Sequence, residues 1–356
     1  MRLTRRRLLA ATGAVAASSV AGCTGGAGGT RRTEAALPTV RASFFVFGDL
    51  AATVAGDAAV AELLVPVGQH GHGWEPGPRV REAIDGADLF VHGMAGFQPW
   101  VDRIVPDLAA DGSGVVTFDA SAGLELLDAG GGHEHDGHED DHDNDHGDGT
   151  HAGSDEAGHD GVVSTRPEGD DGHEDDHAGG ADPHFWMDPL RVAAAVDTVR
   201  RGLTDVDAAS ADVYATNAER FRVRLTDLHE RTESVVADGS TDVVLVAGHN
   251  SFRYLGDRYG VTVESLTDTS PDDRPTTRDV ERARAVVDEH GLRYICADPL
   301  ESQRAAEQLV AETDAEAVLP LTAMPGLTRE WDDQGWGYVD VVENVNLPTL
   351  ERALDG

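Results

Sequence analysis

The chain has 356 residues and a formal net charge of −37 at pH 7, with 65 acidic residues against 28 arginines and no lysine. A surface this acidic repels nucleic acid and anionic membrane surfaces, so we expect no nucleic-acid partner. Because acidic residues are abundant along the whole chain, the composition favours adaptation to high salt, where like charges are screened. The length is sufficient for two domains.

The first residues have the pattern of an export signal. Arginines at positions 5–7 precede an apolar stretch at residues 8–21, which is shorter than the roughly 20 residues of a membrane span. Paired arginines favour the twin-arginine route, with the general secretory route as the alternative. Cys23 stands where a lipid-modified cysteine would become the mature N-terminus, unless it merely lies near an ordinary cleavage site.

We therefore predict a signal peptide at residues 1–22 and a flexible, Gly-rich tether at residues 23–38. The exported protein would be anchored to the outer face of the cytoplasmic membrane by the lipid on Cys23.

Apolar segments alternate with helical patterns on both sides of one long helical stretch. Strands are expected at residues 39–47, 62–67, 87–92 and 115–118, with helices at 189–203 and 208–237. Further strands are expected at residues 243–247, 261–265, 293–297 and 317–319. This alternation predicts parallel sheets flanked by helices. The fold class is α/β with two lobes, at residues 39–210 and 239–356, joined by a long rigid helix at 211–238.

A histidine-rich acidic insert interrupts the first lobe. Residues 129–182 contain nine histidines and eighteen acidic residues but few aliphatic ones, which predicts a disordered loop. Imidazoles beside carboxylates on a flexible chain can form weak, exchangeable metal sites, although a solvated acidic tract is the alternative. The histidines of this accessory metal loop are His133, His135, His138, His142, His146, His151, His159, His173 and His177.

Three other histidines follow strands or lie in loops. His72 lies in HGHGWEP, His184 in DPHFWMDP, and His249 directly after the strand VLVAG. Ligands of parallel α/β domains bind beside the carboxyl ends of the strands, and three imidazoles meeting there would form a zinc-type site. Spacing alone does not show that they meet, and each could be an ordinary loop or core histidine.

Several motifs in the same order resemble one family, the high-affinity zinc and manganese receptors of ABC importers. The resemblance extends over residues 40–354 and rests on GQHGHGWEPGP, DPHFWMDP, GHNSFRYLGDRYGV and DTSPDDRPTTRDV. It implies a metal-receptor type of the periplasmic binding protein fold, with His72, His184 and His249 as metal ligands. Together with the acidic composition, it predicts a haloarchaeal source.

The resemblance also bears on which metal is bound. Manganese members carry a carboxylate at the third ligand place, where this chain has His249, and nitrogen ligands suit zinc better than manganese. Thr322 stands near the place of a fourth, carboxylate ligand, so the fourth ligand is open between water, His70 and Asp298.

Aromatic and acidic residues flank the proposed ligands. Trp74, Phe185 and Trp186 could exclude water from the metal, or simply be core residues of their loops. Glu75, Asp182 and Asp188 are candidate carboxylates behind the histidines, where they would fix the histidine tautomers. Glu75 and Asp188 could instead cap the helices that follow them.

The sequence thus predicts a monomeric, lipid-anchored receptor that captures Zn²⁺ between two lobes and delivers it to an ABC permease and its ATPase. A manganese receptor and a metal buffer or sensor are the alternatives. A zinc hydrolase would also use three histidines, but the chain lacks an HExxH motif and a placed general base, so we expect no enzyme.

Overall fold

The computed structural model describes residues 36–129, 180–267 and 274–355. The predictions for the signal peptide, for Cys23 and for the nine histidines of the insert lie outside these residues. In the part of the chain that is described, no helix combines the length and apolar character that crossing a membrane requires.

The first lobe is built on a four-stranded parallel sheet with the order β2-β1-β3-β4. Its strands are β1 (Thr39–Ala42), β2 (Val60–Leu63), β3 (Leu89–His92) and β4 (Val116–Asp119). Its helices are α1 (Phe45–Ala55), α2 (Pro78–Asp85), α3 (Pro99–Asp111) and α4 (Pro189–Val206). A single 3-10 turn, Phe185–Met187, precedes α4.

The second lobe repeats this arrangement, with the strand order β6-β5-β7-β8, again all parallel. Its strands are β5 (Val243–His249), β6 (Thr262–Thr267), β7 (Tyr294–Ala297) and β8 (Ala317–Pro320). Its helices are α6 (Arg253–Tyr259), α7 (Thr277–His290), α8 (Arg304–Glu312), α9 (Arg329–Gln334), α10 (Tyr338–Val341) and α11 (Leu347–Leu354). A π-helical turn, Val342–Asn346, joins α10 to α11. The predicted fold class is confirmed.

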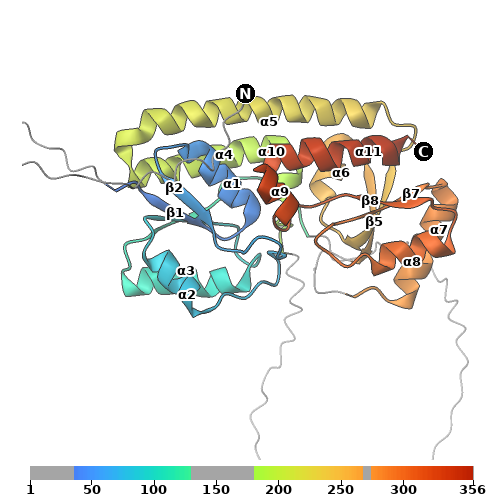
Figure 1. Cartoon of the computed structure of the whole chain (residues 1–356), viewed down its shortest axis with the longest axis horizontal. Helices are drawn as coiled ribbons and strands as arrows, with labels where there is room; N and C mark the ends of the chain where they lie inside the picture. The colour runs from blue at the N-terminus through green and yellow to red at the C-terminus, as the bar shows by residue number, and fades with distance from the viewer. Residues whose placement is uncertain (1–35, 130–179, 268–273, 356) are drawn as a thin grey trace, which may run out of the picture. The chain divides into compact units, whose positions relative to one another are not determined.

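One long helix, α5 (Ala211–Ala237), links the two lobes (Figure 1). Its 27 residues span roughly 40 Å at 1.5 Å per residue. Along that length it contacts α1 and α4 of the first lobe and α6 and α11 of the second. Because α5 packs against both lobes, it opposes a wide hinge motion between them.

The sequence-based assignment is wrong for part of the first lobe. The predicted strand at residues 39–47 ends at Ala42, and α1 begins at Phe45. The segment FVFGDLAATVA is apolar along most of its length because α1 is buried on several sides, and such a run has no helical periodicity to distinguish it from a buried strand.

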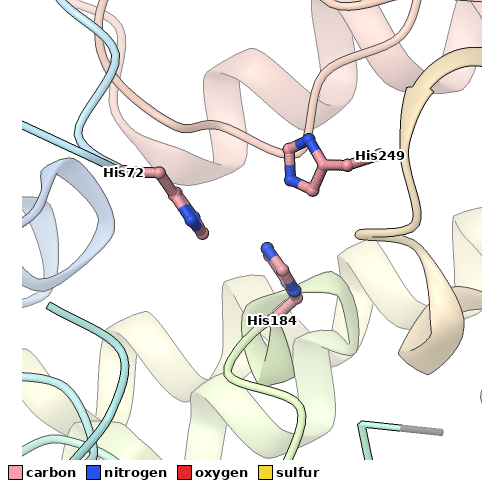
Figure 2. Close-up of side chains that lie close together, drawn as sticks. All are labelled: His72, His184 and His249. Atoms are coloured by element: carbon pink, nitrogen blue, oxygen red, sulfur yellow. The ribbon is translucent and has the colours of Figure 1, made fainter. Parts of the chain in front are cut away.

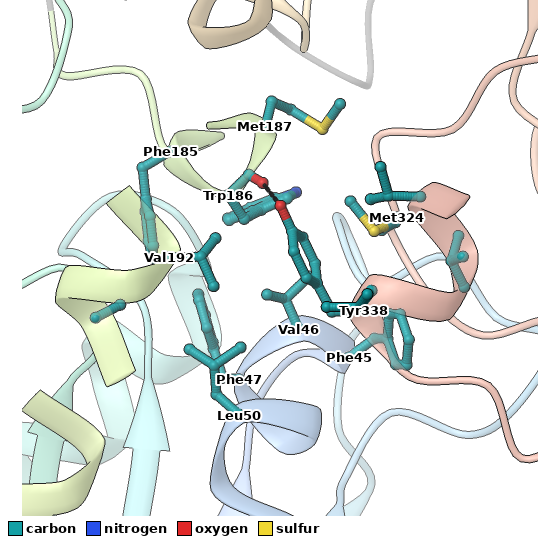
Figure 3. Close-up of a cluster of buried hydrophobic side chains, with 14 of the residues drawn as sticks. Phe45, Val46, Phe47, Leu50, Phe185, Trp186, Met187, Val192, Met324 and Tyr338 are labelled. Atoms are coloured by element: carbon teal, nitrogen blue, oxygen red, sulfur yellow. Dashed lines mark hydrogen bonds between the residues drawn. The ribbon is translucent and has the colours of Figure 1, made fainter. Parts of the chain in front are cut away.

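Buried side chains from both lobes form one continuous apolar cluster (Figure 3). Trp186, fully buried, donates its indole N–H to the carbonyl oxygen of Ala323 at 2.7 Å. The hydroxyl of Tyr338 donates to the carbonyl oxygen of Trp186 at 2.6 Å. These bonds tie the segment before α4 to the C-terminal part of the chain.

The loop between β2 and α2 also meets the loop between β8 and α9 through backbone hydrogen bonds. The amide of Gly71 donates to the carbonyl oxygen of Pro325 at 2.6 Å, and that of Gly68 donates to Leu327 at 2.7 Å. A Cβ atom on Gly326 would lie 2.2 Å from the carbonyl oxygen of Gln69, so only glycine fits there. The loop that carries His72 is therefore fixed to the second lobe by backbone contacts.

The ends of the insert are ordered and paired. The amide of Ala129 donates to Gly180 and that of Asp182 donates to Leu127, both at 2.7 Å. The disorder predicted for residues 129–182 is therefore wrong for Ala129 and for residues 180–182. Asp182 is also fully buried, so the chain is held in place two residues before His184.

Candidate metal centre

The three histidines of the motifs meet at the carboxyl ends of the strands (Figure 2). His249 is the last residue of β5, His72 lies in the loop between β2 and α2, and His184 precedes the turn before α4. One ring nitrogen from each lies within 4.8 Å of the other two. Three nitrogens bound to one Zn²⁺ would be about 3.4 Å apart, so shifts of an ångström or so would complete such a site.

Asp182 holds the ring of His184. The Nδ1–H of His184 donates to Oδ1 of Asp182 at 2.7 Å, and the backbone amide of His184 donates to the same oxygen at 2.9 Å. This bond leaves Nε2 with its lone pair, and that buried atom has no hydrogen-bond partner among the described residues. Burial lowers the pKa of His184 even though Asp182 acts to raise it, so the ring is neutral near pH 7.

His249 is oriented in the same way by a different carboxylate. Its Nδ1 lies 3.2 Å from Oε1 of Glu301, and its buried Nε2 has no partner in the described part of the chain. A Cβ atom on Gly248 would lie 2.9 Å from Oε2 of Glu301, so the glycine provides space for this carboxylate. The sequence analysis did not single out Glu301, which lies in the loop between β7 and α8.

Aromatic rings surround His72. The edges of Phe44 and Phe97 approach its ring, with centroid separations of 5.5 and 4.8 Å. Burial lowers the pKa of His72 well below its usual value, and His184 and His249 lower it further. His72 is therefore neutral and able to donate a lone pair to a metal.

His70, a candidate fourth ligand, makes contacts with other groups through both of its ring nitrogens. Its Nε2 lies 3.2 Å from Oε1 of Glu301 and its Nδ1 lies 3.3 Å from the carbonyl oxygen of His72. Both partners can only accept, so these contacts favour a ring with protons on both nitrogens. Burial lowers the pKa of His70, but Glu301 outweighs it and the net pKa is raised. A protonated imidazole has no lone pair for a metal.

Asp298 is also engaged. Its Oδ2 accepts from the hydroxyl of Thr322 at 2.6 Å, and its Oδ1 accepts from the amide of Leu300 at 2.8 Å. Burial raises the pKa of Asp298 to about 6. Among the described residues, neither His70 nor Asp298 joins the group of three histidines, so that group offers a metal three ligands.

Two of the three predicted supporting carboxylates lie elsewhere. Glu75 is exposed and pairs with Arg103 at 3.0 Å, because this part of its loop lies at the surface. Asp188 is buried, but it caps α4 by accepting from Leu190 and pairs with Arg258 at 2.6 Å. Of the three predicted carboxylates, Asp182 is the one whose hydrogen bond to a proposed ligand, His184, is found among the described residues.

The three aromatic residues predicted to flank the ligands lie in different surroundings. Trp186 contacts His184, with ring centroids 5.4 Å apart, and so walls the site. Phe185 stacks on Phe47 in the core behind it. Trp74 packs edge-to-face against Trp100, in a separate apolar cluster of the first lobe.

A solvent-open cavity of about 630 Å³ adjoins the histidines. Its lining includes His70, His72, His249 and Glu301, together with residues at the start of α8. The cluster is thus aromatic and closed on one side and open to solvent on another.

Two parallel α/β lobes linked by one long helix, with a histidine cluster at the strand ends, define the class of two-lobed solute receptors. The chain belongs to the family described as zinc-uptake complex component A, periplasmic, which matches residues 40–353.

Curated relatives agree with this assignment. The chain is 26% identical over 313 residues to the high-affinity zinc uptake system protein ZnuA of Bacillus subtilis (strain 168), covering 88% of this chain and 86% of that protein. It is 26% identical over 316 residues to the zinc-binding lipoprotein AdcA of Streptococcus pneumoniae (strain R6). That match covers 88% of this chain but 55% of AdcA, so the chain spans about half the length of that relative.

Among solved structures, the fold is similar to the Zn(II)-bound ZnuA-like domain of Streptococcus pneumoniae AdcA. The TM-score is 0.67 at 22% identity, and the superposition covers 90% of this chain and all of that domain. The crystal structure of ZnuA gives a TM-score of 0.65 at 19% identity.

Proposed function

We propose that the protein is an extracytoplasmic receptor that binds Zn²⁺ through His72, His184 and His249 and delivers it to an ABC importer. The observation that carries this proposal is a pair of buried Nε2 atoms, on His184 and His249, without partners among the described residues. Each belongs to a ring whose Nδ1 faces a carboxylate. Carboxylates that accept from the other ring nitrogen of a histidine orient the ligands of zinc sites in this way.

Nitrogen ligands favour zinc over manganese. Three neutral imidazoles are softer than the oxygen ligands that manganese prefers, and three ligands leave a coordination position for exchange. Family membership and the zinc proteins among the relatives support the same cargo. The site binds and releases an ion, and we assign it no catalytic role.

Capture would need small movements. The bonds of Trp186 and Tyr338 and the packing of α5 hold the lobes together. The ion would draw the three rings inward by about an ångström, and release to the permease would reverse these shifts.

The decisive test compares the full-length protein with its His249→Ala variant in zinc titrations against a high-affinity competing chelator. We expect the tightest site to lose affinity on the order of a hundredfold or more, since losing a ligand costs more than losing a carboxylate that orients a ligand. His290→Ala, on the exposed end of α7, is the matched control and should bind like the wild type. Undiminished tight binding in His249→Ala would sink the assignment.

The remaining predictions complete this proposal. A lipid on Cys23 would hold the exported monomer at the membrane, so Cys23→Ala should release it into the medium.

The nine insert histidines would collect or sense zinc beside the tight site. Deleting residues 130–179 should then lower the zinc stoichiometry without weakening the tightest site.

A further inference from the structure

One short segment between β8 and α9 is connected to all three parts of the chain that carry the proposed ligands. We call residues 322–327 the linking segment. Residues 322–326 are buried, although they lie in a loop and belong to no helix or strand. The linking segment contains none of the three histidines, so any effect that it has on a bound metal is indirect.

Two hydrogen bonds connect the linking segment to the histidines of the first lobe. The carbonyl oxygen of Ala323 accepts from the indole N–H of Trp186 at 2.7 Å, and the ring of Trp186 contacts that of His184. The carbonyl oxygen of Pro325 accepts at 2.6 Å from the amide of the residue directly before His72. The positions of both ligands therefore depend on where these two carbonyl groups point.

A third connection leads to the histidine of the second lobe. The hydroxyl of Thr322 donates to Oδ2 of Asp298 at 2.6 Å. The carbonyl oxygen of Asp298 in turn accepts from the amide of Glu301 at 3.0 Å. Oε1 of Glu301 lies 3.2 Å from Nδ1 of His249. The linking segment thus reaches the third ligand through one turn of the chain.

The π-helical turn before α11 holds the linking segment from its other side. The side-chain oxygen of Asn346, a buried residue of that turn, accepts from the amide of Thr322 at 3.0 Å. The side-chain amide of Asn346 donates to the carbonyl oxygen of Thr322 at 2.9 Å. Turns of this kind are rare and often lie at functional sites.

Met324, in the middle of the linking segment, has a strained backbone. Its φ is 57°, and among the described residues it alone has a positive φ without being glycine. Side chains disfavour this conformation, and a residue before proline favours an extended one instead. Such strain persists where the surroundings enforce it. Here the bonds of Ala323 and Pro325, on either side of Met324, enforce it and also position His184 and His72.

We propose that the linking segment holds the three ligands as one unit, and that the strain at Met324 sets the rate at which zinc leaves. Relaxation of Met324 to a negative φ would turn the carbonyl groups on either side of it and separate the three rings. A small apolar cavity of about 20 Å³, lined by Met324, Trp186 and Met187 among others, leaves room for this movement (Figure 3).

This inference rests on the proposed function and deepens it, because it concerns how the same site retains and releases zinc. Zinc binds where the three rings are together, and the strain favours the relaxed state in which they are apart. A change that removes the strain should therefore slow the release of zinc. A change that loosens the linking segment should speed it.

Stopped-flow release of zinc from the full-length protein into excess chelator tests the inference. One equivalent of zinc is loaded, so that the tightest site fills first. Met324→Gly and Met324→Ala both remove the side chain beyond Cβ, but only glycine adopts a positive φ without strain. We expect zinc to leave Met324→Gly about fivefold or more slowly than Met324→Ala. Equal rates would overturn the inference and leave the zinc site standing.

Asn346→Ala gives a second measurement, because it removes both bonds to Thr322. We expect zinc to leave about tenfold faster than from the wild type. Thr232→Val, which removes a buried hydroxyl that donates within α5, is the matched control and should release zinc like the wild type. Release rates that follow the free energy of urea unfolding in every variant would make the segment merely structural and overturn the inference.

The Met324 pair decides the inference if Asn346→Ala does not fold. Failure of the wild type to bind zinc would instead overturn the proposed function.

Discussion

The two lobes have the same strand order, yet they contribute different surroundings to the metal site. The first lobe supplies His72 and His184, enclosed by Phe44 and Trp186. The second supplies His249 with Glu301, a carboxylate that is 23% exposed in the open cavity. We call the surroundings of His72 and His184 the closed half of the site and those of His249 and Glu301 the open half. We infer that the closed half keeps the imidazole lone pairs available for a metal, whereas the metal enters and leaves through the open half.

Of the two carboxylates behind the histidines, Asp182 should show the larger effect when its charge is removed. In Asp182→Asn the amide can donate to Nδ1 or accept from it, so the ring loses its fixed tautomer. We expect the zinc affinity of the tightest site to fall about 10- to 100-fold in chelator competition. Glu75→Gln is the matched control, because Glu75 lies with Arg103 away from the histidines. Equal losses in both variants would contradict this orienting role.

The corresponding change in the open half should cost less. Glu301→Gln keeps a hydrogen-bonding group near His249 but removes the charge that raises the pKa of His70. We expect a loss of about tenfold or less, because solvent partly screens this carboxylate. The same competition assay measures it. A loss larger than that of Asp182→Asn would reverse the comparison between the halves.

The two halves should also titrate differently in the metal-free protein. Nitrogen NMR of the imidazoles should place the pKa of His72 and His184 below 6.5 and that of His70 above it. Lowered values in the folded state mean that the stability contributed by His72 and His184 is present above pH 6.5. It is lost as the pH falls below that value.

The contribution of His70 has the opposite sign. Its raised pKa stabilises the fold below pH 6.5, and this stabilisation is lost as the pH rises through the folded-state value. Urea unfolding of His70→Asn at pH 5.5 and pH 8 should therefore show a larger destabilisation at the lower pH. A variant effect independent of pH would exclude a charged His70 in the folded protein.

Much of this arrangement could be predicted from the sequence because the signals were local. His249 follows an apolar strand, and DPHFWMDP places Asp182 two residues before His184, close enough for their contact. The prediction that Glu75 supports a histidine was wrong because closeness in sequence does not fix the direction of a side chain in a loop. Glu301 comes from a segment distant in sequence from His70, so only the fold brings the two together.

A signal for Glu301 was nevertheless present. It follows β7 closely, at the edge of the sheet where β5 also ends in His249. Acidic residues after neighbouring parallel strands deserve the same scrutiny as histidines there. The burial of α1 could not be read in this way, because its apolar run fits a strand as well as a helix.

The backbone bonds from Gly68 and Gly71 to the loop at Pro325–Leu327 have a consequence for protein engineering. Backbone bonds and the contact of the His70 side chain with Glu301 set the position of the loop that carries His72, and none of them uses the imidazole of His72. That ligand can therefore be exchanged for cysteine or aspartate without moving the loop. We expect the metal preference of such a receptor to change through this one substitution, while the backbone of the loop keeps its position.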